Sequence, residues 1–316
     1  MGESSNKTVL WLALGTVYVV WGSTYLAIRV AVRTIPPFIS AGSRFLVAAL
    51  IVGAVLALGR GMSSLRVTLP EVLGCTFVGG MLLLGGNGLV VLAEQHIDSG
   101  LAALVVAAVP LWIVLLRLMS GDRPRTPTIL AVLVGFGGIA LLLAPGGGST
   151  RIVGILTVLA GSLCWSIGSF RAGRLRLPAD PFVTTFYEMV AGGTLMFVVA
   201  VARGEFTHFS LSDVSGKSAA SWVYLVVAGS MLAFTAYVWL LQNAPISFVA
   251  TYAYVNPAVA VALGALLLGE HIGWPVLAGG AIVIASVAVV VSVEHRPQQE
   301  AVRAAVPAPE TPATVD

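Results

Sequence analysis

Two ionisable side chains lie deep inside long apolar segments of this chain. Arg44 and Glu188 are each the eighth residue of such a segment, and Glu188 is the only carboxylate well inside one. A charged residue at the centre of a membrane-spanning helix costs about 2.5–3.5 kcal/mol on insertion scales, so each needs a reason to be there. A carboxylate that faces an internal cavity would suit proton coupling. Packing or helix capping by Glu188 and outward snorkelling of Arg44 are the alternatives.

Asn87 places an amide in the middle of the apolar segment 71–92, within the glycine-rich run 84–88. Glycines loosen a helix and let another backbone or a solute approach closely. The amide therefore predicts a hinge or a contact to solute. Tight helix packing, with the amide as a hydrogen-bonding group between helices, is the alternative.

Prolines interrupt two further segments. Pro110 and Pro257 each remove a backbone donor and free the carbonyl about four residues earlier. Paired prolines at membrane depth fit a moving or cavity-lining segment, with a simple kink as the alternative. Tyr252 and Asn256 are four residues apart and share a helix face. Polar and aromatic side chains at membrane depth face protein or water rather than lipid. We therefore predict a solute cavity near mid-membrane lined by Trp21, Tyr25, Asn87, Trp112, Trp165, Glu188, Tyr237, Tyr252 and Asn256.

The segments that must position these side chains are hydrophobic and long. The chain is 58% hydrophobic and 10% charged, with a mean hydropathy of +0.96, whereas soluble domains carry about 25% charged residues. A spanning helix needs about 20 mainly apolar residues, and a barrel strand only about 10. Ten segments fit helices: 9–31, 37–58, 71–92, 99–119, 127–144, 153–172, 181–202, 220–242, 247–268 and 274–293. The sequence thus predicts an all-α membrane protein with ten transmembrane helices.

The chain repeats itself. A shift of 144 residues superposes Trp21 on Trp165, Pro37 on Pro181, Arg44 on Glu188 and Gly135 on Gly279. Such a constant offset indicates a duplicated unit, here 9–144 and 153–293. Each copy holds five segments, an odd number, so the second copy enters the membrane from the opposite side. Inverted repeats of this kind are typical of alternating-access transporters, with the substrate site near the midplane between the halves.

Orientation follows from the distribution of basic residues. With the N-terminus inside, eleven Lys and Arg lie on the inner side and five on the outer side. Cytoplasmic loops carry the excess of Lys and Arg, so both termini are predicted to be cytoplasmic. Residues 294–316 are polar and rich in Pro and Ala, which predicts a disordered cytoplasmic tail.

Several motifs resemble the EamA family of the drug/metabolite transporter superfamily, and in particular its inner-membrane members. They are Trp21-Gly22-Ser23-Thr24-Tyr25, Pro36-Pro37, Arg44-Phe45, Gly86-Asn87-Gly88, Ala93-Glu94-Gln95-His96, Tyr252-Ala253-Tyr254-Val255-Asn256-Pro257 and Leu268-Gly269-Glu270. The resemblance implies two EamA repeats of five helices and transport of a small solute, often export. One departure is that the first repeat has Gly121-Asp122 where the second has Gly269-Glu270.

Other classes of function fit less well. The four histidines lie in loops or at segment ends, without metal-ligand spacing, and the chain has no Walker loop. We expect no metal, no cofactor and no nucleic acid. A membrane-embedded enzyme acting on a lipid is the main alternative, but it would need a converging set of reactive groups within the spans. The expected partners are a small-molecule solute and the lipid bilayer, while coupling to protons and assembly as a homodimer are left open.

Overall fold

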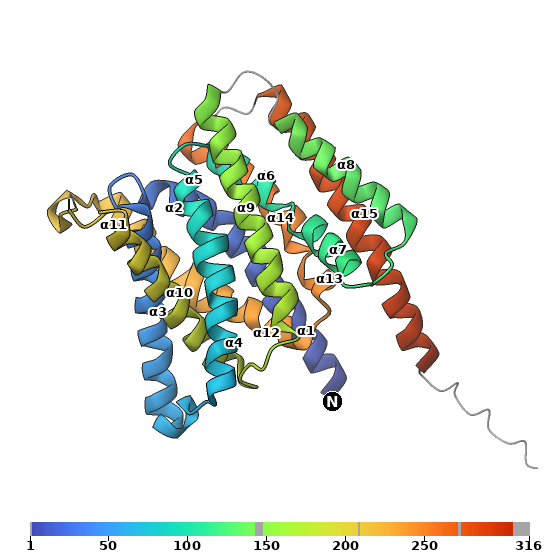
Figure 1. Ribbon diagram of the computed structural model, residues 1–316, viewed down its shortest axis with the longest axis horizontal. Helices are drawn as coiled ribbons and strands as arrows, with labels where there is room; N and C mark the ends of the chain where they lie inside the picture. The colour runs from blue at the N-terminus through green and yellow to red at the C-terminus, as the bar shows by residue number, and fades with distance from the viewer. Residues whose placement is uncertain (1, 143–147, 208, 271–272, 306–316) are drawn as a thin grey trace, which may run out of the picture.

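The apolar segments form helices. The computed structural model describes residues 2–142, 148–207, 209–270 and 273–305, and all the regular structure within these residues is helical (Figure 1). Eight helical stretches of described residues are long and apolar enough to cross a membrane. Two shorter apolar helices, Thr126–Leu142 and Val255–Leu268, stand where the fifth and ninth segments are predicted. The expectation of an all-helical, membrane-spanning chain is confirmed.

The first half contains α1 (Gly2–Thr16), the π-helix η1 (Val17–Trp21), α2 (Gly22–Ala31), α3 (Pro37–Arg60), the 3-10 turn η2 (Met62–Leu65), α4 (Leu69–Gly79), the π-helix η3 (Gly80–Gly88), α5 (Leu89–Ala93), α6 (Ser99–Val106), α7 (Val109–Met119) and α8 (Thr126–Leu142). The second half contains α9 (Gly148–Ala172), α10 (Pro181–Ala202), the 3-10 turn η4 (Leu211–Asp213), α11 (Gly216–Tyr224), the π-helix η5 (Leu225–Phe234), α12 (Thr235–Asn243), α13 (Ile246–Val249), α14 (Tyr252–Leu263), the π-helix η6 (Gly264–Leu268) and α15 (Trp274–Ala305). The helix α15 thus runs into the segment for which a disordered tail is predicted, and residues 306–316 of that segment lie outside the described residues.

Helices in equivalent positions of the two halves lie side by side. The second helices, α3 and α10, pack along each other, and so do the fifth helices, α8 and α15 (Figure 1). The π-helix η3 packs against α9. The interior is therefore built between the halves, and a site there takes side chains from both.

Local sequence explains where several helices begin. Pro37 and Pro181 stand in the first turns of α3 and α10, where a missing N–H is tolerated. The side chain of Asp180 accepts a hydrogen bond from the Phe182 backbone N–H at the start of α10. Thr68 and Glu71 form a capping box at the start of α4.

Two helices of the first half are capped by carboxylates of the second half. The local N-cap residues of α3 and α6 make no side-chain cap. Instead, Glu205 Oε2 accepts hydrogen bonds from the backbone N–H groups of Phe38 and Ile39, both at 3.0 Å. The Glu270 carboxylate accepts from the Ser99 N–H at 3.0 Å, the Ser99 hydroxyl at 2.7 Å and the Gly100 N–H at 3.1 Å. These contacts satisfy helix N-termini that otherwise lack acceptors.

Gly79 permits the closest approach between α4 and α10. A Cβ atom at this position would collide with the backbone carbonyl oxygen of Glu188 and lie 2.9 Å from its Cα, whereas a Cβ at the adjacent Gly80 would meet only Leu195 at 3.4 Å. Gly79→Ala is therefore expected to lower the thermal unfolding temperature of the detergent-purified protein clearly more than Gly80→Ala, because backbone cannot move aside as a flexible side chain can. Equal effects of the two substitutions would contradict this packing.

The chain turns at two opposite ends of the helices. We call the end with turns 32–36, 94–98 and 203–215 the Glu94 face, and the end with turns 61–68, 120–125 and 173–180 the Asp180 face. The caps from Glu205 and Glu270 both lie at the Glu94 face.

Candidate functional site

Four aromatic rings from both halves meet between the helices. Trp21, at the end of η1, lies with its ring centroid 5.3 Å from Trp165 on α9, 4.9 Å from Tyr237 on α12 and 5.5 Å from Tyr252 on α14. The Trp165 ring N–H donates to the Tyr237 hydroxyl at 3.0 Å, and that hydroxyl pairs with the Ser169 hydroxyl at 2.7 Å. We call these four rings the aromatic cluster. Edge-on and tilted contacts of this kind are favourable for aromatic pairs.

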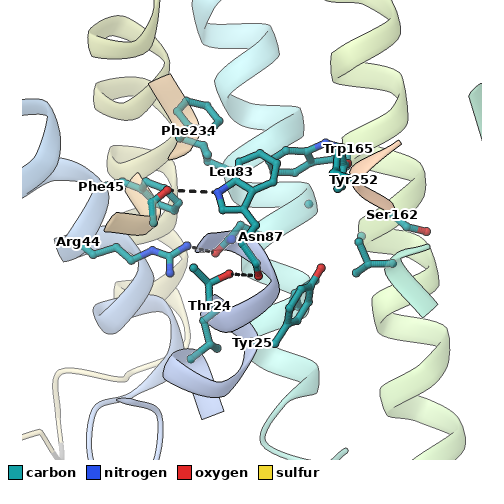
Figure 2. A pocket seen from close by; sticks show the side chains of 17 residues that line it. Thr24, Tyr25, Arg44, Phe45, Leu83, Asn87, Ser162, Trp165, Phe234 and Tyr252 are labelled. Carbon is teal, nitrogen blue, oxygen red and sulfur yellow. Dashed lines mark hydrogen bonds between the residues drawn. The ribbon is translucent and has the colours of Figure 1, made fainter. Parts of the chain in front are cut away.

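A cavity opens against three rings of the aromatic cluster. Its apolar wall includes Phe45, Leu83 and Phe234, and its polar groups come from Arg44, Asn87 and Ser162 (Figure 2). About 60 Å³ is open to the centres of water molecules, enough for a few waters at about 10–15 Å³ each on this measure. The complete lining is Trp21, Thr24, Tyr25, Ile28, Arg44, Phe45, Leu83, Gly86, Asn87, Val90, Val106, Gly161, Ser162, Trp165, Gly229, Phe234 and Tyr252. The described conformation thus holds a narrow central cavity shared by both halves.

Arg44 and Asn87 form the polar side of this cavity. The Arg44 Nη2 atom donates to Asn87 Oδ1 at 2.7 Å (Figure 2), and the guanidinium carbon lies 4.4 Å from the Phe45 ring centroid. Arg44 is only 3% exposed, so it does not snorkel outward. Asn87 lies in the π-helix η3, a geometry that is frequent at functional sites.

The structure places the predicted site residues at four kinds of position relative to the central cavity. Trp21, Tyr25, Asn87, Trp165 and Tyr252 line the cavity together with Arg44. Tyr237 lies behind the lining as part of the aromatic cluster. The Trp112 ring N–H donates at 2.9 Å to Ser162, which lines the cavity, and its ring contacts Phe136. Asn256 is 2% exposed on α14, outside the lining, and neither of its amide atoms has a hydrogen-bond partner.

Glu188 lies on α10 and is not part of the lining of the central cavity, in contrast to the prediction. It is 2% exposed, and its Oε2 atom has no hydrogen-bond partner. Arg44 is not its partner, since Arg44 bonds Asn87. A buried carboxylate oxygen without a partner is costly, so its presence calls for a functional explanation.

The two prolines occupy different positions relative to the breaks in their spans. Pro110 stands in the first turn of α7, immediately after the interruption at Ala107 and Ala108. Pro257 lies inside α14, and the interruption of that span falls earlier, at Ala250 and Thr251. Both spans are therefore broken, but only the first break adjoins its proline.

Glu94 is a buried acid that sequence reasoning did not select. It follows α5 at the Glu94 face and is 0% exposed, with both carboxylate oxygens lacking hydrogen-bond partners. Its backbone carbonyl accepts a hydrogen bond from Arg29 Nη1. Burial raises the pKa of Glu94 well above its ordinary value of 4.5; nearby Glu270 adds to the rise, while Arg29 and Arg44 oppose it. Because Glu94 directly follows an apolar run, its position in the sequence is typical of a loop residue.

Glu94→Gln is expected to reduce the loss of stability with rising pH. An acid whose pKa is higher in the folded than in the unfolded state stabilises the fold most below the unfolded value, and this contribution falls as pH rises toward the folded value. The window therefore starts near pH 4.5 and extends upward. Glutamine cannot ionise, so the variant should gain stability over the wild type in thermal unfolding at pH 8 but not at pH 4. If the stabilities of the variant and the wild type changed with pH in parallel, Glu94 would not be the group with the raised pKa.

A second hollow lies at the Asp180 face. It is lined by Arg117, Ser120, Asp122, Ser169, Phe170, Gly173, Arg174, Leu241 and Ile246. Ser169 also bonds Tyr237, so the layer of Ser169, Tyr237 and Trp165 separates this hollow from the central cavity. Within the described residues, no group of three or more His, Cys, Asp or Glu is placed to hold a metal ion.

Comparison with known proteins identifies relatives that match about nine tenths of the chain. The model of the EamA-like transporter family matches residues 6–144 and 152–292. The chain is 38% identical over 285 residues to the uncharacterized inner membrane transporter YedA of Escherichia coli K12, which covers 89% of this chain and 90% of that protein. It is 23% identical to the uncharacterized transporter YvbV of Bacillus subtilis, over 90% of this chain and 92% of that protein. A crystal structure with 20% identity matches with a TM-score of 0.64, over 92% of this chain and 99% of that one, and so shares the fold.

Proposed function

This chain belongs to the EamA-like transporter family, and we propose that it is a secondary transporter that moves a small metabolite or drug-like solute across the cytoplasmic membrane by alternating access. The central cavity carries the proposal. It lies between the halves and combines aromatic rings with Arg44 and Asn87, the kind of lining expected around a solute. The family and the named relatives are transporters rather than enzymes.

The arrangement of the two hollows supports alternating access. The layer of Ser169, Tyr237 and Trp165 stands between the central cavity and the hollow at the Asp180 face. Opening this layer would connect the cavity to that face, while the Glu270 contact holds α6 at the other face. Movement of one half against the other would open the cavity to each side in turn.

The transporter is proposed to have ten spanning helices in two inverted repeats, with both termini and the Asp180 face in the cytoplasm. Activity reporters fused after residue 316 and inserted in the turn 203–215 are expected to lie on opposite sides of the membrane, because basic residues favour the inner side. A cytoplasmic signal from 316 and a periplasmic signal from 203–215 is the predicted pair. Finding both reporters on the same side would rule out the inverted arrangement.

One experiment can identify both the solute and the direction of transport. Culture media from strains that lack or overproduce the protein are compared for all exported small molecules, and a changed compound is then tested for exchange in liposomes that contain purified protein. Accumulation in the medium on overproduction supports an exporter, and depletion supports an uptake permease. A compound that changes in the media but never exchanges in liposomes would contradict transport by this chain.

Uphill movement needs an energy source other than nucleotide hydrolysis, because the sequence contains no Walker motif. The energy source is then either exchange of one solute for another or coupling to protons. For proton coupling, Glu188 is the proposed carboxylate. Its burial without a partner for Oε2 supports this role.

A further inference from the structure

Arg44 presents a positive charge to the central cavity with unused donors. The guanidinium group stays protonated in proteins and offers five N–H groups. In the structure Nη2 bonds Asn87, while Nε and Nη1 are buried without hydrogen-bond partners. Among the described residues no carboxylate forms an ion pair with Arg44. A buried cation in this state is costly unless another group completes its shell.

The rest of the lining is uncharged, with neutral polar groups such as Asn87 and Ser162 among mainly apolar residues. Aromatic rings of Trp21, Phe45, Trp165 and Phe234 surround the cavity, and its lining includes no Asp, Glu, Lys or His. Glu94, the acid that acts on Arg44 electrostatically, lies outside the cavity lining and forms no ion pair with Arg44. The cavity therefore combines one positive charge with mainly apolar and otherwise uncharged walls.

We propose that Arg44 binds the carboxylate of the transported solute, whose apolar body lies against the aromatic rings. This inference rests on the proposed transport function and assigns the solute class as small monocarboxylates. An arginine pairs with a carboxylate through two parallel hydrogen bonds, from Nη2 together with either Nε or Nη1. Nη2 uses one of its two N–H bonds on Asn87, so its second N–H and one of the two unpartnered nitrogens can form such a pair. A phosphate ester would bring more negative charge than one arginine offsets, and an ammonium group would find no acid in the lining.

Matched probes that differ only in the charged group test the proposal. Binding of radiolabelled benzoate, 3-phenylpropanoate and hexanoate to the purified full chain in detergent is compared with binding of benzamide, 3-phenylpropanamide and hexanamide. At least one acid is expected to bind roughly ten- to hundredfold more tightly than its amide, the range expected for hydrogen bonds between charged groups. If no pair shows this preference in the wild type, the proposal is overturned.

Variants of the cavity assign the preference to Arg44. Arg44→Gln should remove it, and Arg44→Lys should retain part of it because the charge stays but the two-pronged geometry is lost. Asn87→Asp keeps Arg44 but replaces the amide oxygen that accepts from Nη2 at 2.7 Å with a carboxylate oxygen. Because this carboxylate would neutralise Arg44, the variant should also lose the preference. Arg60→Gln, on the Asp180 face and paired with Asp180, is the matched control and should leave it unchanged. A preference that survives both Arg44→Gln and Asn87→Asp overturns the proposal.

Counterflow in liposomes separates this inference from the transport function. If the wild-type protein binds an acid preferentially but exchanges none of the acids across the vesicle membrane, the result contradicts transport. The assignment of acid binding to Arg44 then still stands. Exchange of a neutral solute that is unaffected by Arg44→Gln would retain transport and overturn the assignment.

Discussion

Glu188→Gln should abolish accumulation of solute against its gradient while leaving protein level and solute exchange largely intact. Glutamine keeps the size and hydrogen-bonding capacity of the side chain but cannot take up or release a proton. In the fold Glu188 is 2% exposed and packs its backbone against Gly79, and its Oε2 lacks a partner. The measurement is uptake into vesicles with an imposed proton gradient, set beside exchange without a gradient.

The control for this change is Asp213→Asn, a carboxylate-to-amide replacement at an exposed position of η4. It should leave both accumulation and exchange at wild-type rates. Accumulation at the wild-type rate in Glu188→Gln would exclude Glu188 as the coupling residue. Loss of folded protein in this variant would assign Glu188 to packing instead.

Glu270→Ala is expected to destabilise the fold strongly. The change removes the acceptor of three hydrogen bonds at the start of α6, from the Ser99 and Gly100 backbone N–H groups and the Ser99 hydroxyl. Loss of an N-cap costs about 0.5–2 kcal/mol, and an unsatisfied buried donor about 1–3 kcal/mol. We therefore expect a loss of about 2–4 kcal/mol in the free energy of unfolding, with faster amide hydrogen exchange at the first turn of α6.

Asp122→Ala is the matched control, because Asp122 holds the position in the first half that Glu270 holds in the second. Asp122 pairs with Arg117 at 2.7 Å, and both side chains are partly exposed. Pairs of this kind contribute about 0–1 kcal/mol. Comparable destabilisation by Asp122→Ala and Glu270→Ala would refute the special role of the Glu270 cap.

The sequence predicts most of the helices and the family, because apolar runs of spanning length are set by local composition. The segments 37–58 and 181–202 correspond to α3 and α10, and the resemblance to the EamA family is confirmed. The difference between Asp122 and Glu270 is also visible in the sequence, and in the structure the two carboxylates have different partners.

Contacts between residues that are far apart in the sequence cannot be predicted from local composition. The bond from Arg44 to Asn87 joins two different helices, and nothing in either local pattern specifies the other. Glu94 follows the end of a span, so its position predicts solvent exposure, but packing of other helices around it buries the side chain. Glu205 caps α3 from a turn that follows α10, for which the sequence near Phe38 gives no signal.

The caps from Glu205 and Glu270 bear on how the protein is made. Ribosomes synthesise the first half before either carboxylate exists, so a nascent chain that ends at residue 144 leaves the N–H groups of Phe38, Ile39, Ser99 and Gly100 without these acceptors. Insertion of the early helices into the bilayer and completion of their ends are therefore separate events in time. The first half therefore acquires these helix caps only after the second half has been synthesised.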